Sequence, residues 1–219
     1  MADADVEGQF WNSPRIVQIF AQDSPSEVIA AYLASHPGSP GTLALDIGCG
    51  GGRHTELLAS SGYDVWACDA HAAMVAETSA RLGPTMSGRV RQAEMSKLPY
   101  ARRSFQLVLA SGVFHNAYSV DELLRSLAEA ARVTAHGGVL YVNMFVRNGL
   151  SLDDQRLEAM AGTPDVYLTE DDLRMVLMSP TALRALFAEV GLVERERRLY
   201  IKEEFSGQRD VYQGWLHVS

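Results

Sequence analysis

The sequence has very few cysteines, and their spacing gives them no shared task. Among 219 residues, only Cys49 and Cys68 are cysteine, and both fall at the ends of predicted strands. This spacing matches neither a structural zinc site nor a disulfide framework. We therefore expect two reduced thiols in the core. The histidines likewise share no metal-ligand spacing, so no metal site is predicted.

Long apolar runs and basic clusters are also missing. No stretch approaches the roughly 18 apolar residues of a membrane helix, and the chain starts with the acidic segment Met1–Asp5, where a secretion signal would be basic. The formal net charge is −8, and short basic stretches such as Arg195–Arg198 include acidic residues. We expect a cytoplasmic protein that binds neither nucleic acid nor an anionic membrane. The sequence carries no signal of oligomeric state.

The composition that remains is that of an ordinary globular protein. With 47% hydrophobic and 21% charged residues, the chain is expected to form a single domain over residues 1–219. From Thr42 to Val142, short β-rich runs alternate with helical segments, which is typical of an α/β protein whose parallel sheet is covered on both faces. The expected strands are Leu43–Ile47, Asp64–Cys68, Arg89–Ala93, Phe105–Ala110 and Val139–Phe145.

Helix signals separate and follow these strands. One apolar stripe, from Val120 to Ala131, predicts a helix that stops at Gly137-Gly138. A second helix is predicted from the cap Ser179-Pro180 to Gly191. Two β-rich segments then follow, Val193–Lys202 and Val211–Val218, and the connection Ser206–Asp210 between them is short enough for a hairpin. These segments therefore predict an antiparallel edge of the sheet.

Two regions lie outside the alternation. Residues 1–40 carry apolar residues at helical spacing and end in the linker Pro37–Gly41, so we expect an N-terminal helical cap. Residues 148–178 are polar and longer than an ordinary connection. We expect them to form an inserted lid or a substrate wall.

A glycine cluster follows the first predicted strand and precedes a helix. Gly48, Gly50 and Gly52 let the backbone approach a ligand that a Cβ atom would block. Arg53 stands where a dinucleotide fingerprint would have its third glycine, which weakens a pyrophosphate interpretation. Asp46, two residues before the first glycine, would place a carboxylate near a ligand's ammonium group or would order the loop.

A second carboxylate stands at the end of the second predicted strand. Asp69 lies about 21 residues after Gly48, where carboxylates of mononucleotide-binding folds accept hydrogen bonds from ribose hydroxyls. A ligand with an ammonium, a sulfonium and a ribose, such as S-adenosylmethionine, would account for both Asp46 and Asp69.

These motifs resemble those of the class I S-adenosylmethionine-dependent methyltransferases. The run Leu43–Arg53 looks like their first motif, Phe105–Ala110 like the fourth-strand motif and Gly137–Leu140 like the turn into the fifth strand. Within that family the chain looks most similar to small-molecule enzymes of the tellurite-resistance type. The resemblance implies a Rossmann-like, seven-stranded, mostly parallel sheet in the order 3-2-1-4-5-7-6, with strand 7 antiparallel, and the methyl donor S-adenosylmethionine as cofactor, which leaves as S-adenosylhomocysteine.

The resemblance also implies which residues contact the cofactor. Gly48 and Gly50 would lie under its methionine and ribose, and Asp69 would accept from the ribose. Met74 would pack beside adenine, while Glu94 and Met95 would read the adenine edge, although aspartate is commoner than glutamate at that position. Ser111 would lie by the methionine moiety and Arg53 by its carboxylate. The expected cofactor-binding set is Asp46, Gly48, Cys49, Gly50, Arg53, Asp69, Ala70, Met74, Glu94, Met95 and Ser111.

The residues that would contact the methyl acceptor are harder to identify from the sequence. His115 follows the fourth strand and is the candidate catalytic base, but residues there often only wall the pocket, which is the interpretation we favour. Trp11, Tyr118 and Arg15 are further candidates for the substrate pocket. The alternatives are a core position for the two aromatic residues and a solvated one for Arg15.

The acceptor class is argued by exclusion. After the fourth strand the chain reads Ser111-Gly112-Val113-Phe114, not the Asn/Asp-Pro-Pro-aromatic motif of enzymes that grip a planar amino group. With the acidic balance, this predicts a small-molecule acceptor with an oxygen, nitrogen, sulfur or metalloid nucleophile. Two other functions stay open: a non-catalytic module that binds S-adenosylmethionine, and a nicotinamide-dependent oxidoreductase, in which Asp69 would also bind a ribose.

Overall fold

The computed structural model describes residues 2–151, 157–204 and 207–218. Its centre is a seven-stranded sheet in the order β3-β2-β1-β4-β5-β10-β9. Strand β10 is antiparallel to both β5 and β9, and the neighbouring pairs among β1 to β5 are parallel. The predicted fold class, strand order and antiparallel strand are therefore confirmed. The strands are β1 (Leu43–Ile47), β2 (Asp64–Asp69), β3 (Val90–Gln92), β4 (Phe105–Ser111), β5 (Thr134–Val146), β9 (Leu192–Glu204) and β10 (Gly207–Val218).

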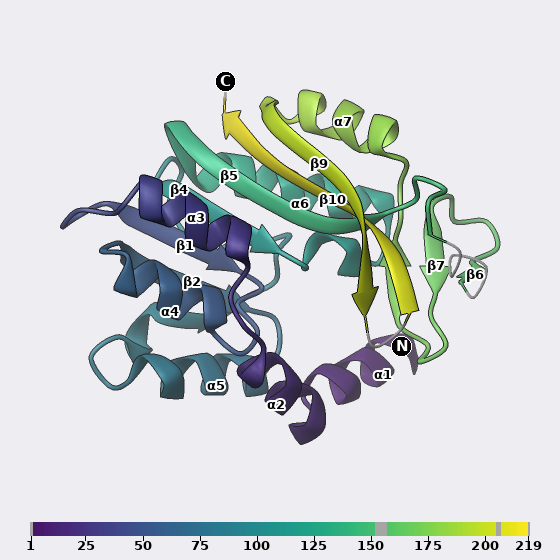
Figure 1. Cartoon of the computed structure of the whole chain (residues 1–219). Helices are drawn as coiled ribbons and strands as arrows, with labels where there is room; N and C mark the ends of the chain where they lie inside the picture. The colour runs from purple at the N-terminus through teal and green to yellow at the C-terminus, as the bar shows by residue number, and fades with distance from the viewer. Residues whose placement is uncertain (1, 152–156, 205–206, 219) are drawn as a thin grey trace.

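Helices cover both faces of this sheet (Figure 1). Alternate residues of one strand point to opposite faces, and β1 is buried on both: Ala44 packs in a cluster with α3 and α4, and Leu45 in a cluster with α6 and α7. This two-sided burial explains why the strands read as nearly continuous apolar runs. The helices are α1 (Ala2–Trp11), α2 (Pro14–Gln22), α3 (Glu27–Ser35), α4 (Arg53–Ser60), α5 (Ala72–Leu82), α6 (Val120–Val133) and α7 (Pro180–Glu189), with short 3-10 turns η1 (Ser87–Arg89) and η2 (Phe114–Asn116).

Serine residues begin three of these helices. The side chains of Ser13, Ser119 and Ser179 each accept a hydrogen bond from the backbone N–H three residues on, at 3.4, 3.1 and 3.2 Å. Pro14 and Pro180 occupy the first helical positions after two of these caps. The predicted Ser179-Pro180 helix and the predicted N-terminal helices are confirmed.

The end predicted for α6 is wrong. The helix ends at Val133, and β5 begins at once at Thr134, whose hydroxyl donates to Ala130 O at 2.7 Å. Gly138 lies inside β5, beside an irregularity in its pairing with β4. A Cβ atom at Gly138 would lie about 3.0 Å from Gln106 O. The glycine therefore serves close backbone approach within the sheet and does not end the helix.

The connection between the last two strands is shorter than predicted. Pairing begins at Gly207↔Glu204 and continues through Arg209↔Lys202 and Asp210↔Ile201, so most of the segment Ser206–Asp210 belongs to β10. Residues 205 and 206 themselves lie outside the described part of the chain. The long hairpin extends the sheet past the carboxyl edge of β5.

The insertion between β5 and α7 forms a small sheet of its own. Strands β6 (Glu158–Ala159), β7 (Val166–Leu168) and β8 (Arg174–Val176) are antiparallel in that order. Residues 152–156 of the predicted insert lie outside the described residues. Figure 1 shows this small sheet at the same end of the molecule as α1. Within the described chain, no helix has the length and hydrophobicity to cross a bilayer.

Candidate functional site

The loop between β1 and α4 exposes its backbone to a cavity. Gly48, Gly50 and Gly52 have φ values of +68, +53 and +81°, a region that side chains disfavour. A Cβ atom at Gly50 would have only the Phe20 side chain within 4 Å, with Cδ1 at 3.7 Å. One at Gly51 would lie 2.4 Å from the backbone N of Ala21. The loop therefore packs against α2 at one glycine and leaves room for a ligand at another.

Asp69, the last residue of β2, is bound to this loop. Its Oδ2 accepts from Gly50 N at 3.0 Å, and its Oδ1 accepts from His71 N, also at 3.0 Å. The side chain is buried, and burial raises the pKa of its carboxyl group. Each oxygen keeps a further lone pair, so the carboxylate remains able to accept hydrogen bonds from a ligand.

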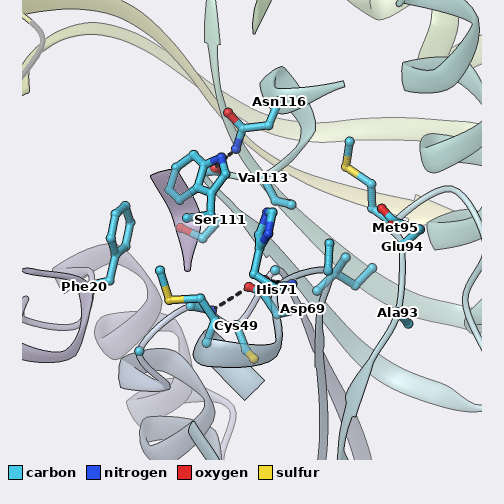
Figure 2. Close-up of a pocket in the computed structure, with 18 of the residues that line it drawn as sticks. Phe20, Cys49, Asp69, His71, Ala93, Glu94, Met95, Ser111, Val113 and Asn116 are labelled. Atoms are coloured by element: carbon cyan, nitrogen blue, oxygen red, sulfur yellow. Dashed lines mark hydrogen bonds between the residues drawn. The ribbon is translucent and has the colours of Figure 1, made fainter. Parts of the chain in front are cut away.

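A cavity of about 500 Å³ opens over this loop at the carboxyl edge of the sheet. In Figure 2, Phe20 lies on one side of it and Glu94 and Met95 on the other, with Asp69 and His71 between them. We call it the first cavity. Ten residues of the predicted cofactor set line it, namely Gly48, Cys49, Gly50, Arg53, Asp69, Ala70, Met74, Glu94, Met95 and Ser111.

Asp46 is the member of that set that does not line the first cavity. It is buried, and its Oδ2 accepts from Thr55 Oγ1 at 2.6 Å. Burial raises the pKa of its carboxyl group to about 7. Of the two possibilities raised by the sequence, ordering of the loop matches this geometry, and direct contact with a ligand's ammonium does not.

A second cavity of about 300 Å³ adjoins the first. It lies beyond the end of β4 and against β5 and β9, and its lining draws on segments from residue 11 to residue 202. The two cavities share six wall residues: Trp11, Phe20, Arg53, Ser111, Gly112 and Asn116. Ligands in the two cavities would therefore lie next to each other.

The predicted pocket residues divide between these cavities. Trp11 lines both, Tyr118 lines the first and His115 lines the second. Arg15 lines neither: it is exposed on α2, whose neighbouring residue Ile16 is buried. Its assignment to the substrate pocket is thus not supported, because the apolar side of α2 faces the protein and Arg15 lies on the solvent side.

Arg53, the first residue of α4, forms an ion pair with Asp23 beyond the end of α2. The pair holds the guanidinium at the boundary of the two cavities, since Arg53 lines both. This position is compatible with the predicted contact to a ligand carboxylate.

His115 makes no contact that would suit a general base. The backbone N of Phe145 donates to His115 Nδ1 at 3.2 Å, and the two rings stack at 4.1 Å. Burial, with the nearby positive charges of Lys202 and Arg209, lowers the pKa of the imidazole to about 3. The ring is therefore neutral near pH 7, and the nitrogen that would take a proton is already an acceptor.

The first cavity also contains residues that sequence reasoning missed. Glu7 of α1 is buried, accepts from Arg174 N at 3.2 Å and so connects the N-terminal cap to β8 of the insertion. His71 stacks against Trp11, with 6.0 Å between the ring centroids. The other missed lining side chains include Asn12, Phe20, His54, Asn116 and Glu122.

Carboxylates outnumber cations around the first cavity. Arg53 is its one lining arginine or lysine among the described residues, and burial lowers the pKa of both His54 and His71. The acidic lining residues are Glu7, Asp69, Glu94 and Glu122. This balance favours a ligand with positive charge. Among the described residues, no cluster of histidine, cysteine or carboxylate side chains is arranged to hold a metal ion.

Comparison with known families finds a match in the central part of the chain. Residues 45–142 match the family model described as "Methyltransferase domain". The match runs from β1, through the glycine loop and Asp69, into β5.

Curated relatives match over part of their length. "Probable tRNA methyltransferase 9B" of Mus musculus is 28% identical over 138 residues, which are 63% of this chain and 26% of that protein. "Demethylmenaquinone methyltransferase" of Parafrankia sp. is 34% identical over 126 residues, 50% of this chain and 48% of that protein. The chain thus spans about a quarter to a half of these relatives.

A solved structure extends the likeness to most of the chain. The 1,6-didemethyltoxoflavin-N1-methyltransferase of Burkholderia thailandensis, solved with 1,6-didemethyltoxoflavin and S-adenosylhomocysteine, has a TM-score of 0.65 at 18% identity. The alignment covers 88% of this chain and 78% of that one, and at this identity it supports the shared fold.

Proposed function

We propose that the chain, whose residues 45–142 match a methyltransferase domain, is a class I enzyme that transfers a methyl group from S-adenosylmethionine to a small molecule. The cofactor would occupy the first cavity and the acceptor the second. The observation that carries this proposal is their common wall, because methyl transfer requires donor and acceptor side by side.

The residues of the first cavity fit the cofactor. Gly50 leaves space above the loop, and Asp69 is held by two backbone N–H groups with lone pairs left for the ribose hydroxyls. Met74 would pack against the adenine, and Glu94 and Met95 would contact its edge. The acidic lining suits the positive charges of the sulfonium and the ammonium.

Methyl transfer from this cofactor would need little acid-base catalysis by the protein. S-adenosylmethionine supplies an electrophilic methyl group, so the chain's own task is to align the acceptor and to keep water away. Ser111 and Asn116, which line both cavities, would position groups at the junction. Trp11 and Phe20 close it on the apolar side, their rings 5.6 Å apart.

The cap would border both ligands, and the insertion would border the acceptor. Residues 1–40 contribute Trp11 and Phe20 to the walls, and residues 148–178 contribute Leu173 and Met175. We propose that these segments belong to one domain with the sheet and act as cap and lid, joined at Glu7 and Arg174. A cavity volume of about 300 Å³ suits a metabolite-sized acceptor.

The comparisons name two acceptor types. The demethylmenaquinone and didemethyltoxoflavin enzymes support a small-molecule acceptor. The tRNA methyltransferase relatives make RNA the alternative acceptor, and methylation of RNA alone would contradict the proposal. The small volume of the second cavity, about 300 Å³, and the net charge of −8 favour the small molecule.

Calorimetric titration with S-adenosylhomocysteine, S-adenosylmethionine and NADH tests the cofactor. We expect micromolar binding of both adenosyl ligands, on the order of −8 kcal/mol, with a clear loss in Asp69→Ala and none in the exposed helix variant Asp121→Ala. Preference for NADH would instead favour an oxidoreductase. Adenosyl binding without methyl transfer to any acceptor in a screen of small molecules, RNA and protein would favour a non-catalytic binding module.

A further inference from the structure

The second cavity differs from the first in its charge. Among the described residues that line it, Asp23 is the one carboxylate, and it is paired with Arg53. Lys202 of β9 lies at its exposed rim. The charged residues that line the first cavity are thus mainly carboxylates, whereas those that line the second are one carboxylate and two cations, Arg53 and Lys202.

Two neutral polar side chains of this cavity, His115 and Tyr200, each have a hydrogen left to donate. In a neutral imidazole whose Nδ1 accepts a hydrogen bond, the proton sits on Nε2. His115, which accepts from Phe145 N at Nδ1, therefore has an N–H left to offer. Its neutrality follows from burial and from the positive charges of Lys202 and Arg209, which lower its pKa.

Tyr200 adds a second donor. Asn143 Nδ2 donates to the Tyr200 hydroxyl at 3.1 Å, so the hydroxyl accepts there and keeps its own hydrogen for another partner. Asn143 is paired in register with Ser111, one of the residues at the junction of the two cavities. The donors therefore begin near the point where the methyl group would arrive.

Apolar side chains form a further part of the wall, which also carries Ser24, Ser26 and Asn116. The apolar side chains come from α2, β5 and the insertion, and they are Ile19, Phe20, Phe145, Leu173 and Met175. At about 300 Å³ the cavity is at the small end of ligand pockets, which span roughly 300 to 1,000 Å³. A ligand that fits this cavity would be a compact, mainly apolar molecule, no larger than a small fused-ring system.

We infer that the acceptor is a compact, mainly apolar ring molecule with an anionic oxygen, either a carboxylate or an ionised phenol or enol, that contacts Lys202 and His115. The inference rests on the proposed function, which makes the second cavity the acceptor site. His115 is on this account a hydrogen-bond donor to the anion. It removes no proton, and an acceptor that arrives ionised needs none removed.

Calorimetry with matched probes tests the inference. The protein, saturated with S-adenosylhomocysteine at pH 8, is titrated with 2-naphthoate against 2-naphthamide and with 4-nitrophenolate against 4-nitroanisole. We expect at least one anion to bind about tenfold tighter than its neutral counterpart, as for a charge-assisted hydrogen bond. The first pair reports on a carboxylate and the second on an ionised phenol.

The chain offers a matched control, since it has two lysines. Lys202→Gln should reduce the preference to less than about threefold, Lys202→Arg should retain most of it, and Lys97→Gln, an exposed residue that lines neither cavity, should leave it unchanged. Equal or tighter binding of the neutral probes, or an unchanged preference in Lys202→Gln, would overturn the inference.

The same titrations separate this inference from the proposed function. S-adenosylhomocysteine is titrated alone, and the probes are also titrated without it. Failure of S-adenosylhomocysteine to bind would defeat the proposed function, whatever the probes do. Binding of S-adenosylhomocysteine with no anion preference would leave the methyltransferase proposal standing and defeat the anionic acceptor.

Discussion

The hydroxyl of Thr55 donates a hydrogen bond to the Asp46 carboxylate at 2.6 Å, and both residues are buried. The bond joins the end of β1 to α4 and thereby fixes both sides of the glycine loop. Asp46 thus acts on the ligand site through the loop, not by contact with the cavity.

The raised pKa of Asp46 makes stability depend on pH. Its carboxyl group has an ordinary pKa of 3.8 and a folded-state pKa of about 7. As pH rises from about 4 to 7, the unfolded chain loses this proton while the folded protein retains it, so the free energy of unfolding should fall. Asp46→Asn should make that fall smaller, because asparagine accepts from Thr55 without ionising.

Urea unfolding of the ligand-free protein at pH 5 and pH 8 measures this effect. The matched control is Asp121→Asn on the exposed side of α6, which should keep the pH dependence of the parent protein. If Asp46→Asn lost as much stability between pH 5 and pH 8 as the parent protein, the raised pKa of Asp46 would be contradicted.

Gly50→Ala should weaken cofactor binding more than folding. The residue has φ +53°, so alanine there costs about 1 to 2 kcal/mol in backbone strain, and the added Cβ atom would enter the space beside Phe20. We expect the affinity for S-adenosylhomocysteine to fall at least about tenfold by calorimetry. Gly41→Ala, with φ +85° and no atom within 4 Å of the added Cβ, should cost similar stability and leave the affinity intact.

His115 should stay neutral throughout the physiological range. Because burial lowers its pKa to about 3, its ring should carry the proton on Nε2 at every pH between 5 and 8. Two-dimensional ¹H–¹⁵N spectra of the imidazole nitrogens, assigned with His115→Gln, report the tautomer directly. Protonation of the ring near pH 6.5 would restore it as a candidate base.

Trp11 should report cofactor binding by fluorescence. Its indole lines both cavities and packs against Phe20 and His71, so S-adenosylhomocysteine should change its emission. The change should persist in Trp66→Phe, since Trp66 lines neither cavity and packs near Tyr100 with a centroid distance of 6.1 Å. It should be lost in Trp11→Phe. An equal signal in that variant would show that the ligand binds elsewhere.

The features that the sequence predicted well are local ones. The glycine loop, the Ser179-Pro180 cap and the buried strands each depend on residues that are close together in the sequence. The position of Asp69 beside the loop could be predicted because the residue lies at the end of a strand. The end of α6 was missed because Gly138 has a tertiary reason for being glycine, its close approach to the β4 backbone. A glycine that ends a helix and a glycine that allows close backbone packing look the same in the sequence.

The second cavity was beyond sequence reasoning for a different reason. Ile19, Asn143, Met175 and Lys202 come from four distant segments, and only the sheet topology brings them together. His115 was noticed by position, but its protonation depends on Phe145 N, which becomes its partner only when β5 pairs with β4. The charge of Asp46 was likewise misjudged, because its burial is a property of the whole fold.

The common wall of the two cavities has a thermodynamic consequence. Any rearrangement of Trp11, Phe20 or Arg53 that improves the fit of one ligand changes the surface met by the other. Binding free energies that are coupled in this way are reciprocal, so the factor by which an acceptor tightens S-adenosylhomocysteine must equal the factor by which S-adenosylhomocysteine tightens the acceptor. A molecule that binds the second cavity could thus be identified by its effect on the first, before any product is formed.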